Sequence, residues 1–330
     1  MATEPVSTPV TTTEPVTPID SYTKPVEYSH DYHAEAHVLS GHLQLPVKQP
    51  IQQHALVVLK DRRGGHFTQT AEDFSLEGLI TFKSGRTRVS GSPSLKPSKG
   101  WVTLSSSILE GMNVFEVITA DRVVAQVSTD HPKIDGHVPH VTFLGTHFEN
   151  FRIGGFPVEI ELDLTICGTK PDGDKPYKTD SDFLDRVAKQ CASIANKPGV
   201  PDAVKAQFLE ELAYIDRLRE RNNGGSSEEG SSGNGISNGR RQSDPPIKCS
   251  LVKSFGKLPP GVTAYGNVLS IPGFGMVSIA EVEVGTEVHD EKPENDSNYF
   301  TLNMVNMQLG CIGHGNVVAG VVTSNGKTKP

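Results

Sequence analysis

Residues that could bind a metal ion gather in one short segment of the chain. They are His131, Asp135, His137, His140 and His147. Imidazole nitrogens and carboxylate oxygens are common ligands of zinc and other first-row metals, and the proline and glycine residues of this segment predict a loop that can bend ligands inward. The spacing therefore makes a metal-assisted hydrolase one candidate function. A polar loop without an ion is the alternative, because the spacing of these histidines is irregular.

A second group of possible ligands occupies alternate positions. His33, Glu35 and His37 would lie on one face of a strand. Same-face Cα atoms are ~7 Å apart and the outer two ~13 Å apart, so one ion could join all three only if the strand bends. We interpret this group as the polar face of a strand.

One cysteine has a histidine nearby in the sequence. Cys311 and His314 belong to the segment Gly-Cys-Ile-Gly-His-Gly at 310–315, and an imidazole can activate a thiol as a nucleophile. Residues three apart on a regular strand point to opposite faces, so only a turn or bulge at Gly313 would bring this catalytic pair together. The alternative is a buried thiol beside a glycine-rich turn.

Cofactor motifs fail on spacing. Gly326-Lys327-Thr328 has the end of a phosphate-binding loop, but five residues separate Gly320 from Gly326 where four are required, and no helix follows. The four cysteines include no Cys-x-x-Cys pair, which is the spacing of zinc fingers and redox sites. We predict that the protein uses no cofactor.

The elements that must position these residues are mainly strands. The clearest is 158–166, where apolar and polar residues alternate as on a strand with one dry face. Further strands are predicted at 34–45, 54–60, 76–82, 101–109, 113–118, 122–128, 138–144, 247–252, 268–271, 276–284, 299–309 and 317–322. Many short strands at even intervals favour an antiparallel β-sandwich or barrel.

The periodicity changes to that of helices after Gly168. Thr179 and Asp182 have the spacing of a capping box, and apolar residues then recur every three or four positions to Ile194. A second stripe runs from Val204 to Leu218, with acidic residues such as Glu211 on the polar face. The two segments predict a helical hairpin inserted into the β-rich fold.

These patterns divide the chain into five parts. They are a disordered Pro/Thr-rich arm (1–29), a β-rich domain (30–177), the helical-hairpin insertion (178–222), a flexible Gly/Ser linker (223–246) and a β-rich segment that completes the same domain (247–330). The last segment would supply few strands on its own, so we expect it to extend the sheets that precede the insertion.

Composition excludes several classes of protein. The net charge of −8 argues against binding to a phosphate backbone. No apolar run exceeds about six residues, whereas a membrane helix needs ~20, and no secretory signal opens the chain. We expect a soluble, cytoplasmic protein with no nucleic-acid or membrane partner. The partner could be a small molecule or a protein, and a homo-oligomer is one option.

Three stretches resemble a known group of proteins. Residues 117–131, 139–150 and 309–315 are similar to a group of uncharacterised soluble bacterial proteins of comparable length. The similarity runs from about Tyr32 to the C-terminus and implies no activity, ligand or catalytic residue.

Taken together, these patterns favour a non-catalytic binding or structural protein of unknown ligand. The alternatives are a metal-assisted hydrolase that uses the segment 131–147 and a self-assembling structural protein. Self-assembly would use the N-terminal arm and exposed strand edges as contacts.

Overall fold

A computed structural model gives the fold of most of the chain. It describes residues 29–95, 100–133, 138–172, 175–223, 236–237, 240–241, 243–287, 297–310 and 313–329. The predicted N-terminal arm, apart from Ser29, and most of the predicted linker lie outside the described residues.

The larger sheet joins the beginning of the chain to its end. Its order is β17-β18-β19-β20-β21-β1-β2, with β15 beside β19 and β3 beside β1. The strands are β1 (Ser29–Leu45), β2 (Gln49–His54), β3 (Val57–Asp61), β15 (Ile247–Ser250), β17 (Thr263–Tyr265), β18 (Val268–Ile271), β19 (Gly275–Glu287), β20 (Ser297–Leu309) and β21 (His314–Lys329). The first and last strands pair antiparallel along almost their whole length, so residues nearly 300 positions apart are neighbours.

The smaller sheet comes from one continuous stretch of chain. Its order is β11-β10-β7-β6-β5-β4, with β8 and β9 beside β7. The strands are β4 (Gly65–Leu76), β5 (Ile80–Pro93), β6 (Trp101–Val114), β7 (Ile118–His131), β8 (His140–Thr142), β9 (His147–Glu149), β10 (Arg152–Ile153) and β11 (Phe156–Pro157). This sheet is built mainly from sequential antiparallel neighbours.

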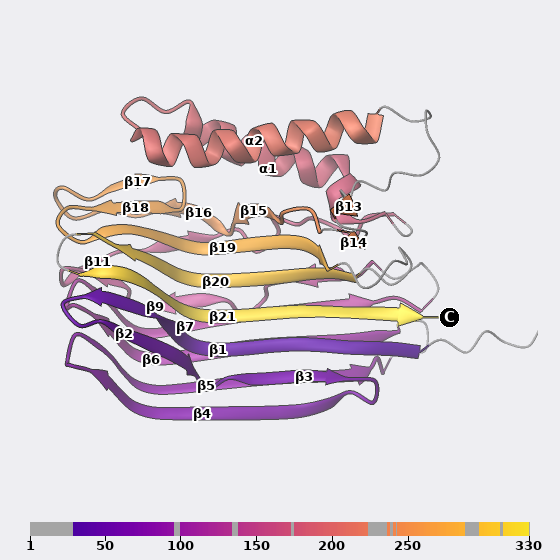
Figure 1. Ribbon diagram of the computed structural model, residues 1–330, viewed down its shortest axis with the longest axis horizontal. Helices are drawn as coiled ribbons and strands as arrows, with labels where there is room; N and C mark the ends of the chain where they lie inside the picture. The colour runs from indigo at the N-terminus through magenta and orange to yellow at the C-terminus, as the bar shows by residue number, and fades with distance from the viewer. Residues whose placement is uncertain are drawn as a thin grey trace, which may run out of the picture.

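The two sheets lie face to face as a β-sandwich (Figure 1). Their inner faces enclose one core of buried apolar residues. Buried hydroxyl groups also link the sheets: Ser105 of β6 donates to the Glu35 carbonyl of β1 at 2.6 Å. Ser107 donates to the His37 carbonyl at 3.0 Å. The prediction of a mainly β protein with a helical insertion is confirmed.

A row of irregular positions crosses the nine-stranded sheet. The strand pairing skips one or two residues at each step, and the skipped residues include a series that lie opposite one another: Ala55, Val38, Gly320, Met304 and Ala280. Every second residue of the row has a left-handed backbone, with φ of 50° at Ala55, 65° at Gly320 and 47° at Ala280. The strands are therefore interrupted at the same level.

The eight-stranded sheet has a matching row. Its skipped residues are Asp73, Lys83, Gly111, Asp121 and Asn150. Again every second one is left-handed, with φ of 50°, 65° and 50° at Asp73, Gly111 and Asn150. Non-glycine residues adopt this conformation at a cost in free energy. Its repetition at the same level of both sheets therefore indicates a regular property of the fold.

The rows shift the alternation of buried side chains by one residue. On β6, Leu109 and Met112 are both buried although they are three positions apart, whereas a regular strand buries every second residue. On β6 the same face of the sheet is thus buried on both sides of the row, with mainly hydroxyl residues before it and apolar residues after it. A reader of the sequence who assumes strict alternation sees two short strands instead of one long strand.

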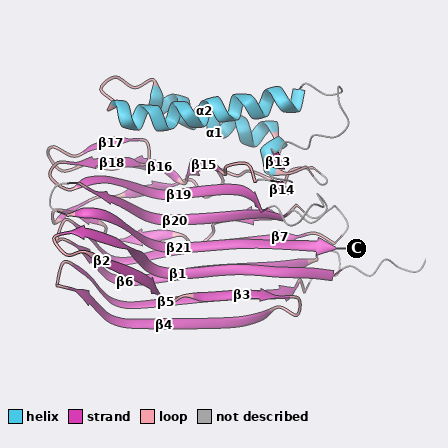
Figure 2. Ribbon diagram, in the orientation of Figure 1, coloured by secondary structure: helices cyan, strands magenta, loops and turns pink. Residues whose placement is uncertain are grey.

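The helical hairpin is formed by α1 (Ser181–Ala195) and α2 (Asp202–Asn223), preceded by the short helix η1 (Tyr177–Thr179). The two helices lie together along the side of the sandwich that carries β15 and β19 (Figure 2). The N-cap of α1 is Asp180, whose carboxylate accepts the Asp182 amide, so the predicted capping box at Thr179 was displaced by one residue. Among the described helices, none has the length and apolar character needed to cross a membrane.

The prediction of one long strand at 158–166, which rested on the clearest alternation in the sequence, is wrong. Within 158–166 only β12 (Ile160–Leu162) is a strand, and it pairs with β16 (Val252–Phe255). A turn follows, in which the Asp163 carboxylate accepts the backbone N–H and the hydroxyl of Thr165. This local side-chain bonding competes with a sheet ladder. A further two-stranded pair joins β13 (Ile236–Ser237) to β14 (Arg240–Arg241).

Candidate functional site

The histidines of segment 131–147 occupy different faces of the eight-stranded sheet. His131 ends β7 and is fully buried between the sheets. His147 lies on β9 opposite Val124, seven residues earlier on β7, and is exposed. His140 begins β8 and pairs with Asp130 of β7. Seven residues of strand span ~23 Å, so the structure does not bring His131 and His147 together, and Asp135 and His137 lie outside the described residues.

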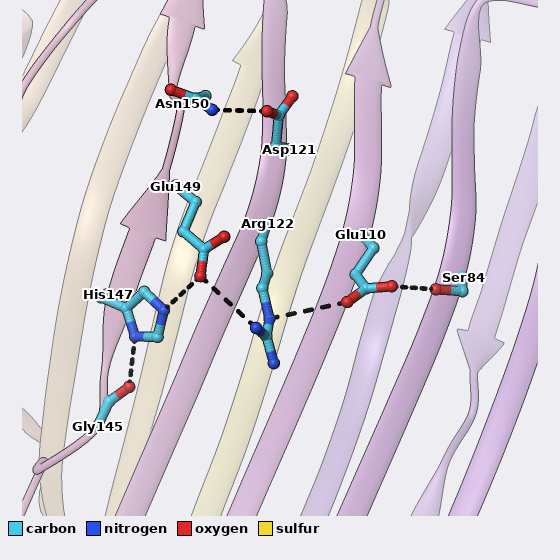
Figure 3. Close-up of polar contacts among 8 residues, drawn as sticks. All are labelled: Ser84, Glu110, Asp121, Arg122, Gly145, His147, Glu149 and Asn150. Carbon is cyan, nitrogen blue, oxygen red and sulfur yellow. Dashed lines mark hydrogen bonds and ion pairs between the residues drawn. The ribbon is translucent and has the colours of Figure 1, made fainter.

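His147 instead belongs to an exposed polar cluster on the outer face of this sheet (Figure 3). Its Nε2 lies 3.1 Å from a carboxylate oxygen of Glu149, which in turn lies 3.6 Å from Nη1 of Arg122. Arg122 also approaches Glu110 at 3.8 Å, and Glu110 accepts a hydrogen bond from Ser84 at 2.8 Å. The charges are balanced by ion pairs within the cluster, although Nε of Arg122 donates no hydrogen bond.

The group on β1 is not assembled around a common point. His33 faces Glu287 at 3.9 Å, whereas His37 contacts Ser40 at 3.0 Å through Nε2. Burial lowers the pKa of His37 to about 4, which keeps this imidazole neutral. Over the described residues, no group of three or more His, Cys, Asp or Glu side chains could hold a metal ion.

The proposed cysteine–histidine pair can be placed only in part. His314 is the first residue of β21 and is exposed, and Cys311 lies outside the described residues. The other three cysteines are buried free thiols: Cys167, Cys191 and Cys249. Burial, followed by the charge of Glu211, raises the pKa of the Cys191 thiol to about 12, so this thiol is protonated and a poor nucleophile.

His131 does have a histidine neighbour, but one that the sequence analysis missed. The ring of His30 lies 4.5 Å from that of His131, centroid to centroid, and stacks on Trp101 at 5.2 Å. Burial lowers the pKa of His30 to about 4. A Cβ on Gly326 would stand 2.7 Å and 2.9 Å from the two Nε2 atoms, so the β21 backbone packs directly against both rings. We interpret this pair as packing between the sheets.

A large cleft lies beside the helical hairpin, and we call it the hairpin cleft. It has a volume of about 510 Å³ and lies between the C-terminal half of α1 and the chain around β16 and β17. Its polar groups include Gln190, Lys197, Lys253 and Asn267, and its apolar groups include Phe255 and Leu258. A volume between about 300 and 1,000 Å³ and a mixed lining are typical of small-molecule sites.

A smaller cavity, which we call the recess, adjoins the hairpin cleft. It measures about 30 Å³ and shares Gln190 and Asn267 with the cleft. The remaining lining residues are Cys191, Gln207, Phe208, Glu211, Lys248, Cys249 and Glu281. They come from α1, α2, β15 and β19, so the helical hairpin and the nine-stranded sheet build the recess together.

Direct hydrogen bonds hold the hairpin on the sheet. The amide of Gln190 on α1 donates to the Ser250 carbonyl and accepts from the Ser250 N–H, both at 2.9 Å. Glu211 on α2 accepts the backbone N–H of Lys248 at 3.0 Å. Because both contacts end on β15, they fix the geometry of the recess.

The two acidic residues of the recess have unusual electrostatics. Burial raises the pKa of Glu211 to about 7, partly offset by its hydrogen bond to Lys248. Burial also raises the pKa of Glu281, which is only 7% exposed. Carboxyl groups with raised pKa values beside a cleft mark a candidate functional site.

The sequence analysis did not identify these residues. Glu211 lies among charged residues on α2 and was assigned to the solvent-exposed face, and Glu281 lies on a strand about 70 residues further along the chain. Only the packing of the hairpin on β15 and β19 brings them together. A weak signal was the alternation of Glu281 and Glu283 with valines, since a solvent-facing strand position covered by a helix becomes buried.

The fold is a β-sandwich with a helical-hairpin insertion and a cleft at their junction. The chain matches the family model described as "Domain of unknown function (DUF8256)" over residues 30–285, and it belongs to this family. No curated protein and no solved structure matches the chain.

Proposed function

We propose that this protein binds a small organic molecule in the hairpin cleft and acts as a binding protein. The observation that supports this proposal is the cleft itself, about 510 Å³ in volume, where an inserted element meets the sheet. Lys197 and Asn267 offer charge and hydrogen bonds, and Phe255 and Leu258 offer apolar contact. Such a combination suits recognition of a molecule with both polar and apolar parts.

The proposal can be tested by narrowing the cleft. Ser193 is exposed on α1 and lines the cleft, so Ser193→Trp should block it with little effect on folding. Lys189→Trp is the matched control, because Lys189 is exposed on the same helix outside the cleft lining.

Thermal unfolding in the presence of a diverse fragment library is the measurement. A ligand at about 100 times its Kd stabilises the folded state by about 2.7 kcal/mol. We expect hits that raise the Tm of the natural protein and of Lys189→Trp but not of Ser193→Trp. A library without hits, or hits that Ser193→Trp leaves unchanged, would contradict the proposal.

The edge strand β4 supports a second candidate function, self-association. In the described part of the chain β4 pairs with β5 alone, and Phe67 on this strand is 47% exposed. A long exposed edge can add a strand from a second copy. Light scattering should then give a mass above 35.6 kDa that falls to the monomer value in Phe67→Lys; a monomeric natural protein rejects this candidate.

A further inference from the structure

Glu281 is a buried carboxylate to which no described residue donates a hydrogen bond. It lies on β19, is 7% exposed and lines the recess. Among the described residues its carboxylate accepts no hydrogen bond, and the positive charge that acts on it is the ammonium group of Lys248. A carboxylate with few donors in a buried position is costly, so a ligand that donates hydrogen bonds to Glu281 would be stabilised in the recess.

The charges around the recess do not balance. Glu211 lines the same cavity, and the hydrogen bond formed by its carboxylate comes from a neutral backbone N–H, that of Lys248. The ammonium group of Lys248 lies 3.4 Å from Glu283. The same ammonium group also acts on Glu281 and Glu211. The region therefore has three carboxyls, one ammonium and the two neutral thiols of Cys191 and Cys249, and a cation is the complementary ligand.

The size of the recess limits that cation to a small group. A volume of about 30 Å³ holds a group of the size of one or two water molecules. An ammonium group fits this space and has three N–H donors. A planar guanidinium is broader and carries five donors. The hairpin cleft next to the recess has room for the body of an organic molecule.

We propose that the ligand of the hairpin cleft is a primary amine, whose ammonium group enters the recess and donates hydrogen bonds to Glu281 and Glu211. The body of the amine lies in the cleft against Phe255 and Leu258. This inference rests on the proposed function, because it names the chemical class of the molecule that the cleft would bind.

The test compares amines with alcohols of the same carbon skeleton. The probes are 2-phenylethylamine, n-hexylamine and 1,6-diaminohexane, each paired with its alcohol, and affinities are measured by calorimetry on the full chain at pH 8. We expect at least one amine to bind 10-fold or more tightly than its alcohol. Equal affinities, or no binding by any of the three amines, would overturn the inference.

Two substitutions locate the effect in the recess. Glu281→Gln should reduce the preference for the amine to less than threefold, and Glu211→Gln should reduce it in the same direction. Glu210→Gln is the control, because it removes the same charge from the exposed face of α2 and should leave the preference unchanged. Thermal unfolding of each variant verifies that it folds.

Failure of this inference can be distinguished from failure of the proposed function. Fragments that lose binding in Ser193→Trp but show no preference for amines would reject the amine and keep the cleft. A preference that persists in Glu281→Gln would also reject it. If no compound of any class binds, both proposals fail.

Discussion

Two groups of acidic side chains, one on the eight-stranded sheet and one between the helical hairpin and the nine-stranded sheet, differ in how their charges are satisfied. On the outer face of the eight-stranded sheet, Glu110 and Glu149 lie in solvent beside Arg122 and are satisfied by their neighbours (Figure 3). Under the helical hairpin, the buried Glu281 and the half-buried Glu211 line a recess that contains more carboxyls than cations.

The difference shows that a cluster of polar residues that the sequence makes conspicuous is not by itself a ligand-binding site. The exposed cluster contains His147, which the sequence marks as a possible metal ligand, yet each of its groups has a nearby partner. The buried pair has no distinctive sequence pattern, but burial raises both pKa values. Uncompensated burial therefore distinguishes the two regions better than residue type does.

The largest expected effect on stability comes from adding a methyl group at Gly266, which lines the hairpin cleft. Gly266 has a left-handed backbone with φ of 61°, and a Cβ there would stand 2.1 Å from Cδ1 of Ile194. Gly266→Ala should lower the free energy of unfolding by about 3 kcal/mol, the sum of backbone strain and overpacking, as measured by urea denaturation.

Gly273→Ala is the control for this substitution. Gly273 also has a left-handed backbone, but no atom lies within 4 Å of its added Cβ. Strain alone should cost about 1 kcal/mol there. Equal losses in the two variants would show that the packing of Ile194 against Gly266 does not hold the helix in place.

The free energy of unfolding should depend on pH through the recess carboxyl Glu211 but not through the exposed cluster, and this effect is smaller. The pKa of Glu211 is about 7 in the folded protein and 4.5 ordinarily, so the folded state binds the proton more tightly. Its contribution to stability is present below pH 4.5 and is lost as pH rises through 7. Glu211→Gln should therefore be more stable than the natural protein by about 2 kcal/mol at pH 8 and nearly equal to it at pH 4.5.

Glu149→Gln gives the comparison from the exposed cluster. Its effect on the free energy of unfolding should stay within about 0.5 kcal/mol at either pH. Urea denaturation at the two pH values measures both variants. A Glu211→Gln variant that is no more stable at pH 8 than the natural protein would remove the distinction between buried and exposed carboxyls.

Backbone strain is also expected away from the hairpin cleft, at the edge of the eight-stranded sheet. Asp73 is exposed on β4 with φ of 50°, so Asp73→Gly should stabilise the protein by about 0.5 kcal/mol by relieving the left-handed backbone. Lys83→Gly, at the neighbouring position of the same row, should destabilise it by about 0.5–1 kcal/mol. Both changes are measured by thermal unfolding, and a loss in both variants would contradict the strain.

The smallest effect is expected inside the exposed cluster. Arg122→Gln removes both ion pairs, to Glu110 and to Glu149, and exposed pairs contribute less than about 1 kcal/mol. We expect a loss below about 0.5 kcal/mol that disappears in 0.5 M salt, as measured by urea denaturation. A loss above about 1.5 kcal/mol would show that this cluster is not an ordinary polar surface.

The sequence predicted the fold class because its two periodicities are local. The apolar stripes after Phe183 and Val204 correctly predicted two helices, and the many short strand patterns predicted antiparallel sheets. The prediction at 158–166 failed because alternation says nothing about a pairing partner, and the Asp163 turn ended the strand.

Local sequence patterns could not predict the lengths of the strands or the position of the candidate site. The rows of left-handed residues break the alternation in every long strand, so the predicted strands 101–109 and 122–128 stop short at the row. The predicted strands 76–82 and 113–118 each span a hairpin turn. The recess depends on which face of α2 the sheet covers. That choice is made by contacts such as Glu211 with Lys248, which join distant parts of the chain.

The most direct test of the central claim is to map the bound molecule. Two-dimensional ¹H–¹⁵N NMR of the natural protein, titrated with the fragment that raises its Tm most, reports which amides change. We predict shifts that concentrate at 190–197 and 252–267, around the hairpin cleft. Shifts centred on β7 and β9 at the exposed cluster, or no shifts at saturating fragment, would contradict the account.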